Sequence, residues 1–95
     1  PKIKTFQGEL EVKSFFRNSL GFFAVTGEGL SQRTWMLTKE EYKRLIRDEI
    51  KELRWKRIQL SKIFVNKGYD KEVEEEAEII DERINFLRKE LEVLG

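Results

Sequence analysis

The sequence predicts an α+β fold: a small antiparallel β-meander of three or four strands, followed by a long α-helical hairpin. Residues 9–16 begin with strict polar–apolar alternation, which is the period of a half-buried strand. Residues 38–94 instead repeat apolar side chains three and four positions apart, as amphipathic helices do. We therefore divide the chain into a sheet, residues 1–37, and a helical hairpin, residues 38–95, within one compact domain.

Turn-forming residues divide the first part into strands. Asn18-Ser19-Leu20-Gly21 ends the strand over 9–16 and leads into Phe22–Thr26, which is rich in β-forming side chains. Gly27-Glu28-Gly29 predicts a second turn, followed by a strand over 31–37. Residues 3–7 predict either a fourth strand or the early part of the first, with a bulge at Gly8.

Capping residues delimit the two helices. Thr38 and Glu41 have the spacing of a capping box, in which each side chain accepts a hydrogen bond from the other residue's backbone amide. The first helix should run to about Asn66, with Gly68 as the C′ residue. Asp70 is the expected N-cap of the second helix.

The second helix has two apolar series. A seam with alternating spacings of four and three residues runs from Val73 to Leu94, and Ile79, Phe86 and Val93 form a seven-residue series beside it. This face is wider than a two-stranded coiled coil requires, so we expect the hairpin to oligomerise as a helical bundle, in a homodimer or homotetramer. The expected interface consists of Ile79, Ile80, Ile84, Phe86, Leu87, Leu91 and Val93.

Composition argues against an enzyme. The 95 residues include no Cys and no His, which removes thiolate metal sites and the commonest general base. No Gly-rich phosphate-binding motif occurs, and no carboxylate pair stands out among 18 acidic residues. We expect no catalytic residue, metal or cofactor. No apolar run is long enough to cross a membrane and the chain does not begin like a signal peptide, so we expect a cytoplasmic location.

The net charge of +1 conceals an asymmetry. Residues 38–67 contain ten basic and five acidic side chains, whereas residues 68–95 contain four basic and ten acidic ones. The two segments either attract each other as helices or leave basic surfaces free for a polyanion. On the first helix, Lys43, Arg47, Lys51 and Arg54 fall on one side, as a solvated face or as part of a phosphate-binding track.

Adjacent aromatic pairs put one ring on each face of the sheet, because neighbouring strand residues point in opposite directions. With an even-numbered first loop, one face carries Leu10, Val12, Ser14, Phe16, Phe23 and Val25. We expect this face to be the core. A two-residue turn at Glu28-Gly29 would pair Phe22 with Trp35 and Ala24 with Arg33 on the other face.

That other face combines aromatic rings with cations. Rings stack on unpaired bases and basic side chains neutralise phosphates, so the combination favours single-stranded nucleic acid, DNA or RNA, as the partner. The expected binding residues are Lys13, Phe15, Arg17, Phe22, Arg33 and Trp35. Two alternatives stay open: a protein interface, and an ordinary core face or a shifted strand register.

These residues and the helical heptads together resemble the ThermoDBP single-stranded-DNA-binding proteins of hyperthermophilic archaea. The high Lys and Glu content also suits a hyperthermophile. The resemblance implies that the sheet and neighbouring helix form a cleft for unpaired bases and that the helical end forms the oligomer. The alternative functions are a protein-interaction or chaperone-like subunit that uses the hairpin, and a small regulator that binds duplex DNA.

Overall fold

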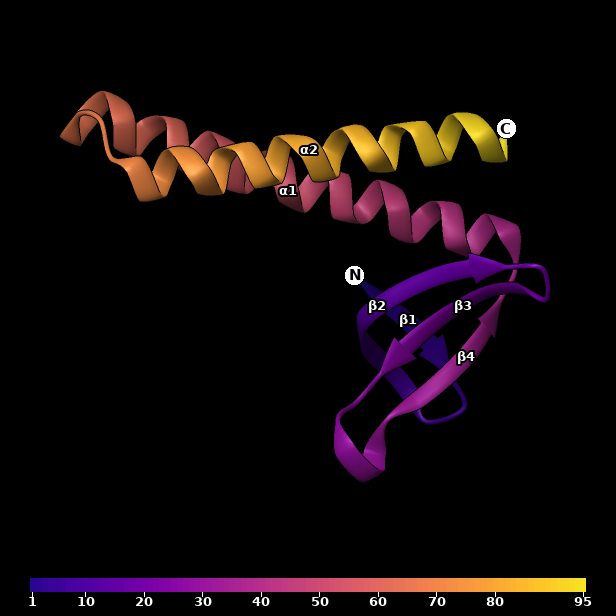
Figure 1. The fold of residues 1–95 in the computed structure, drawn as a ribbon. Helices are drawn as coiled ribbons and strands as arrows, with labels where there is room; N and C mark the ends of the chain where they lie inside the picture. Colours follow the sequence, from indigo (N-terminus) through magenta and orange to yellow (C-terminus); the bar gives the residue numbers. More distant parts are fainter. The chain divides into compact units, whose positions relative to one another are not determined.

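Four antiparallel strands in chain order form a curled sheet, and two helices follow it in sequence (Figure 1). The computed structural model describes all residues, 1–95, in two compact units, Pro1–Leu45 and Ile46–Gly95. The elements are β1 (Lys2–Thr5), β2 (Gly8–Asn18), β3 (Gly21–Thr26), β4 (Arg33–Leu37), α1 (Lys39–Lys67) and α2 (Lys71–Leu94). The predicted α+β fold, a β-meander with a helical hairpin, is confirmed.

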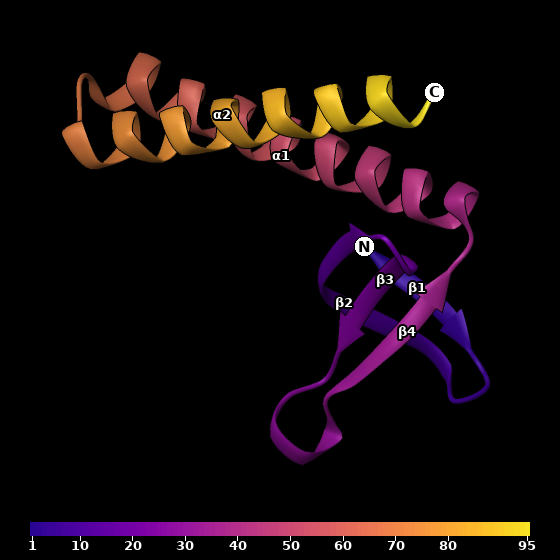
Figure 2. The same ribbon diagram turned by 45° about the vertical axis from the view of Figure 1, so that its right-hand side comes forward.

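The long strand β2 bends and pairs with two neighbours, β1 through its first residues and β3 through its remaining ones (Figure 2). Its register shifts between Val12 and Ser14, so that Lys13 is the extra residue of a β-bulge. Val12 therefore lies opposite Thr26, and Phe15 lies opposite Ala24, on the same face of the sheet. The bulge reverses the predicted alternation between the two halves of β2.

The predicted core face is consequently right for Val12, before the bulge, and wrong for the residues beyond it. Phe16 and Phe23 stack on each other on the outer face, where Phe16 is exposed and Phe23 half-buried. The inner face instead carries the buried residues of the sheet, and side chains from the first turns of α1 pack against it. The buried set of this unit is Ile3, Val12, Ala24, Thr26, Leu37, Tyr42 and Leu45.

The connection between β3 and β4 is also longer than predicted. A short 3-10 helix, Gly29–Ser31, replaces the two-residue turn, and Ala24 pairs with Trp35 instead of Arg33. Phe22 pairs with Leu37 instead of Trp35. Because the register differs from the prediction by two residues, Trp35 and Arg33 stay on the predicted face.

The helix boundaries follow the predicted caps. The Thr38 hydroxyl accepts from the Glu41 amide at 3.1 Å, and Glu41 accepts from the Thr38 amide at 3.2 Å. Gly68 ends α1 with φ of +83° and donates to the Phe64 carbonyl. The Asp70 side chain accepts from the amides of the first turn of α2.

In the second unit, α1 from Ile46 onward and α2 run antiparallel and lie side by side in both views (Figures 1 and 2). The apolar seam of α2 faces α1, as its period predicts. The buried side chains of the unit are Ile46, Ile50, Leu60, Ala77, Ile80, Ile84, Leu87 and Leu94. No helix of the chain is both long and apolar enough to cross a lipid bilayer.

Candidate functional site

Five of the six residues predicted to bind nucleic acid form two groups on the inner face of the sheet, and the sixth, Lys13, lies at the bulge of β2. Phe15 and Phe22 contact Tyr42 of α1, with ring centroids 5.5 Å and 5.0 Å apart. Both rings are half-buried, and Tyr42 is buried. Their packing stabilises the unit and leaves little ring surface for a ligand, while Arg17 lies exposed on β2 opposite Phe22.

The second group consists of Arg33 and Trp35, which lie beside Phe6. The Arg33 guanidinium carbon lies 5.3 Å from the centroid of the Trp35 ring and 5.4 Å from that of Phe6. The two rings are themselves 5.5 Å apart, with their planes tilted by 59°. We call Phe6, Arg33 and Trp35 the ring–cation stack.

Phe6 is the functional candidate that the sequence prediction missed. Its side chain is 81% exposed, although a phenyl ring ordinarily gains by burial. It belongs to the connection between β1 and β2, where the Thr5 hydroxyl accepts from the Gln7 amide and donates to the Gly8 carbonyl. An aromatic residue inside such a turn was the available signal, but the expectation of a strand over 3–7 concealed it.

Trp35 is held in a defined orientation. Its indole Nε1 donates to the Thr26 hydroxyl at 2.8 Å, and Thr26 is buried. The indole is half-buried, so the inner part of the ring is fixed while the remainder stays accessible. The ring–cation stack therefore combines one anchored ring, one exposed cation and one exposed ring.

A groove of about 320 Å³ lies beside the stack and shares Arg33 with it. Lys13, the bulge residue, lines this sheet-end groove and pairs with Glu28 at 3.3 Å. The bulge that reverses the alternation of β2 thus also places Lys13 near Arg33. The other lining residues are Gln7, Leu10, Glu11, Thr26, Gly27 and Ser31.

The predicted oligomer residues are divided between the inside and the outside of the hairpin. Ile80, Ile84 and Leu87 are buried in the single chain, and Leu91 is half-buried. The seven-residue series remains outside: the exposed fractions of Ile79, Phe86 and Val93 are 67%, 54% and 69%.

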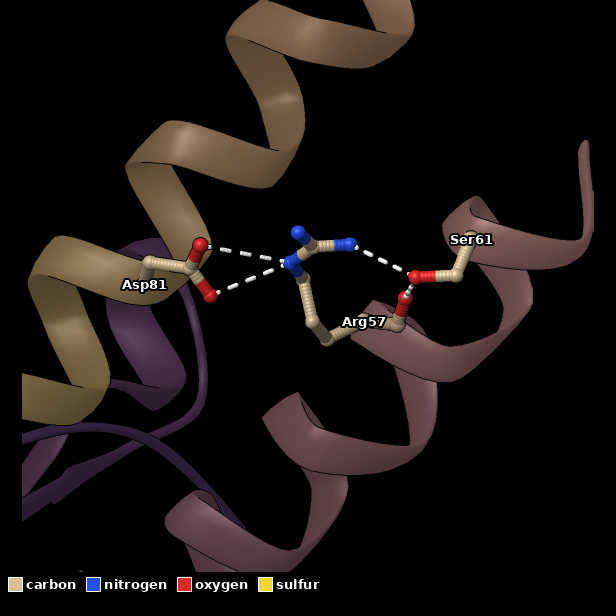
Figure 3. Close-up of polar contacts among 3 residues, drawn as sticks. All are labelled: Arg57, Ser61 and Asp81. Atoms are coloured by element: carbon tan, nitrogen blue, oxygen red, sulfur yellow. Dashed lines mark hydrogen bonds and ion pairs between the residues drawn. The ribbon is translucent and has the colours of Figure 1, made fainter. Parts of the chain in front are cut away.

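Arg57 of α1 makes a polar contact with Asp81 of α2. Its Nε donates to both carboxylate oxygens of Asp81, at 3.1 Å and 3.3 Å, and one terminal nitrogen donates to the Ser61 hydroxyl (Figure 3). On the hairpin, Arg83 pairs similarly with Glu49 at 2.8 Å. These pairs join the two helices and are part of the scaffold.

No group of three or more acidic side chains lies close enough together to hold a metal ion. A hydrogen bond to Glu74 raises the pKa of the Tyr69 phenol, far along the chain from the ring–cation stack.

No family model, curated protein or solved structure matches the chain. The resemblance to the ThermoDBP proteins therefore stays an expectation.

Proposed function

We propose that the protein binds single-stranded nucleic acid, DNA or RNA, at the ring–cation stack. The observation that carries the proposal is the exposed Phe6 ring held beside Arg33 and the half-buried Trp35. An accessible ring offers a face to a base, and stacking contributes about 1–3 kcal/mol per base. The guanidinium of Arg33 lies next to both rings, and in this proposal it pairs with the phosphate of a stacked nucleotide.

The chemistry of the stack favours an unpaired strand over a duplex. A base can cover Phe6 only when its own face is free, and in a duplex the neighbouring base pairs occupy those faces. Lys13 lines the adjacent groove and adds a second cation for the backbone. Of the six residues predicted from the sequence, the proposed site retains Lys13, Arg33 and Trp35 and adds Phe6.

The direct test compares Phe6→Ala with Leu20→Ala, since Leu20 is 79% exposed at a turn of the same sheet. Binding to fluorescein-labelled poly-dT is followed by anisotropy at low salt. Phe6→Ala should weaken binding by about 1–3 kcal/mol, whereas Leu20→Ala should leave it unchanged. Equal affinities for both variants and the wild type would contradict the proposed site.

The proposal includes a homodimer formed through α2. An antiparallel pair with its two-fold axis at Phe86 would place Ile79 against Val93 of the partner subunit. The same arrangement sets Glu82 opposite Lys89 of the partner subunit, so the flanking charges are complementary. This pairing would cover the exposed series Ile79, Phe86 and Val93.

A second candidate function, a protein-interaction subunit that uses the hairpin, rests on the same exposed series. It predicts normal oligomers, no affinity for oligonucleotides and a co-purifying protein. The anisotropy measurement with poly-dT therefore separates the two candidate functions.

A further inference from the structure

A second groove, on the helical hairpin, is lined by cations from both helices. Arg47, Lys51 and Arg54 come from α1, and Arg88 comes from α2. The groove has a volume of about 400 Å³, and its remaining lining residues are Ile50 and Leu91. No carboxylate lines it, although the chain has almost as many acidic as basic side chains. We call these six residues the basic groove.

None of its four cations makes an ion pair within the chain. Other arginines of the hairpin do: Arg57 pairs with Asp81, and Arg83 pairs with Glu49. The four charges of the basic groove therefore repel one another without a compensating contact. A bound polyanion would relieve that repulsion and release counterions of its own.

We propose that the basic groove binds the phosphodiester backbone of a nucleic acid. The inference rests on the proposed function for its ligand class and adds a second, separate contact surface. Arg47 to Arg54 extend about 10 Å along α1, and a stacked strand carries one phosphate per ~3.4 Å of axis, so the dimensions suit about three phosphates.

The side-chain types also favour phosphates. Three of the four cations are arginines, whose planar forks bind two oxygens of one phosphate at once. The apolar floor, the buried Ile50 and half-buried Leu91, suits the sugar face between phosphates. A high density of charge with no hydrogen-bond acceptor among the lining side chains is poorly suited to a neutral ligand.

The test uses the full-length chain and fluorescein-labelled poly-dT, with anisotropy measured over a series of salt concentrations. The groove variant is Arg54→Gln with Arg88→Gln, one change on each helix. The matched control, Lys56→Gln with Lys62→Gln, removes the same charge from exposed lysines outside the groove. Circular dichroism verifies that both variants keep the helical content of the wild type.

The groove variant should bind at least tenfold more weakly than the control, because two phosphate contacts are lost. The slope of log K against log salt should fall by about 1.4, at ~0.7 per contact with a single strand. Arg54→Lys with Arg88→Lys keeps the charge but loses the forks, and should bind with intermediate affinity. Phe6→Ala should lower affinity with little change in slope, which separates the two sites.

Equal losses in the groove variant and the control would overturn the inference, because only bulk charge would then matter. A groove variant with unchanged salt slope but altered mass by light scattering would also overturn it, and would assign the groove to an acidic segment of a second copy. If the groove variant loses binding while Phe6→Ala does not, the result supports the basic groove as a binding site and contradicts the ring–cation stack. No binding by the wild type would overturn both.

Discussion

At the scale of single residues, an arginine beside two neighbouring rings forms the candidate site. Arg33 could have paired with a carboxylate, as Lys13 does with Glu28, but its guanidinium lies beside Phe6 and Trp35 instead. Cation–π contacts at exposed sites contribute about 0.5–1 kcal/mol, which is too little to explain an exposed phenyl ring by stability alone. Phe6 differs from other exposed apolar side chains, such as Leu20, in lying beside both Arg33 and Trp35, and the proposed binding role rests on that arrangement.

The anchoring of Trp35 predicts a measurable cost when the indole is replaced. Trp35→Phe removes the donor to the Thr26 hydroxyl, which stays buried without that partner. The free energy of unfolding should fall by about 1–3 kcal/mol in urea denaturation. Because the loss arises from the unpaired hydroxyl, Trp35→Phe with Thr26→Val should recover part of it, and the absence of recovery would contradict this role.

Tyr69 predicts a pH dependence at the hairpin turn. Its hydroxyl donates to Glu74 Oε2 at 2.5 Å, and this hydrogen bond is the largest reason why the pKa of the phenol is raised above its ordinary value near 10. The folded chain holds the proton more tightly than the unfolded chain does. The stabilising effect is therefore present below the unfolded pKa and is lost as pH rises through the folded one.

Ultraviolet titration of the phenolate measures this directly, with Tyr69→Phe used to separate the signal from that of Tyr42. Glu74→Gln removes the carboxylate and should move the Tyr69 transition to lower pH. An unmoved transition would show that Glu74 does not raise the pKa.

At the scale of elements, the sequence predicts the helices better than the sheet. Helix ends depend on a few local side chains, and the expected caps at Thr38, Gly68 and Asp70 are all present. The face of a strand depends instead on every residue before it, so the single bulge at Lys13 reversed the predicted core. No residue type in the sequence around Lys13 predicts that bulge.

Because the faces of the strands depend on register, only part of the candidate site could be predicted from the sequence. Arg33 and Trp35 share a face because their strand is regular, and the two-residue error in register preserved it. Phe15 and Phe22 share that face too, but the sequence does not reveal that Tyr42 covers them. Phe6 could not be assigned to the site from the sequence, because the position of its ring depends on the path of the β1–β2 connection.

The 3-10 connection predicts that two glycines of similar backbone conformation differ in their tolerance of substitution. A Cβ at Gly27 would lie 2.4 Å from the Ser31 carbonyl oxygen, whereas one at Gly29 would have no neighbour within 4 Å. Both residues have positive φ, so both changes to Ala share a backbone cost of about 1–2 kcal/mol.

Gly27→Ala should therefore destabilise the protein by about 1–3 kcal/mol more than Gly29→Ala, as thermal or urea unfolding would reveal. Since Gly27 and Ser31 both line the sheet-end groove, Gly27→Ala should also weaken oligonucleotide binding. Indistinguishable stabilities for the two variants would mean that the connection adapts without cost.

At the scale of the whole molecule, the structure shows which of the charged side chains pair and which do not. The basic middle and acidic end of the sequence are joined at scattered pairs such as Arg57–Asp81, while four cations remain unpaired in one groove. Net charge near zero would predict weak interaction with polyanions. The local concentration of cations predicts the opposite, with a steep dependence on salt.

The exposed apolar series of α2 predicts a dimer in solution. Size-exclusion chromatography with light scattering should give twice the chain mass of 11.4 kDa at micromolar concentration. Phe86→Glu should yield a monomer, because it buries a charge at the proposed two-fold axis. The control Val65→Glu changes a more exposed apolar residue of α1, which lies outside the proposed interface, and should leave the dimer intact. A monomeric wild type would reject this arrangement.

The central claim is that an unpaired base stacks at the ring–cation stack. Trp55→Phe removes the second indole, which is 62% exposed on α1, and leaves Trp35 as the sole tryptophan reporter. Titration of this variant with poly-dT at low salt should quench and saturate the Trp35 fluorescence, with weaker quenching by duplex of equal nucleotide concentration. Unchanged Trp35 emission throughout the titration would contradict the claim.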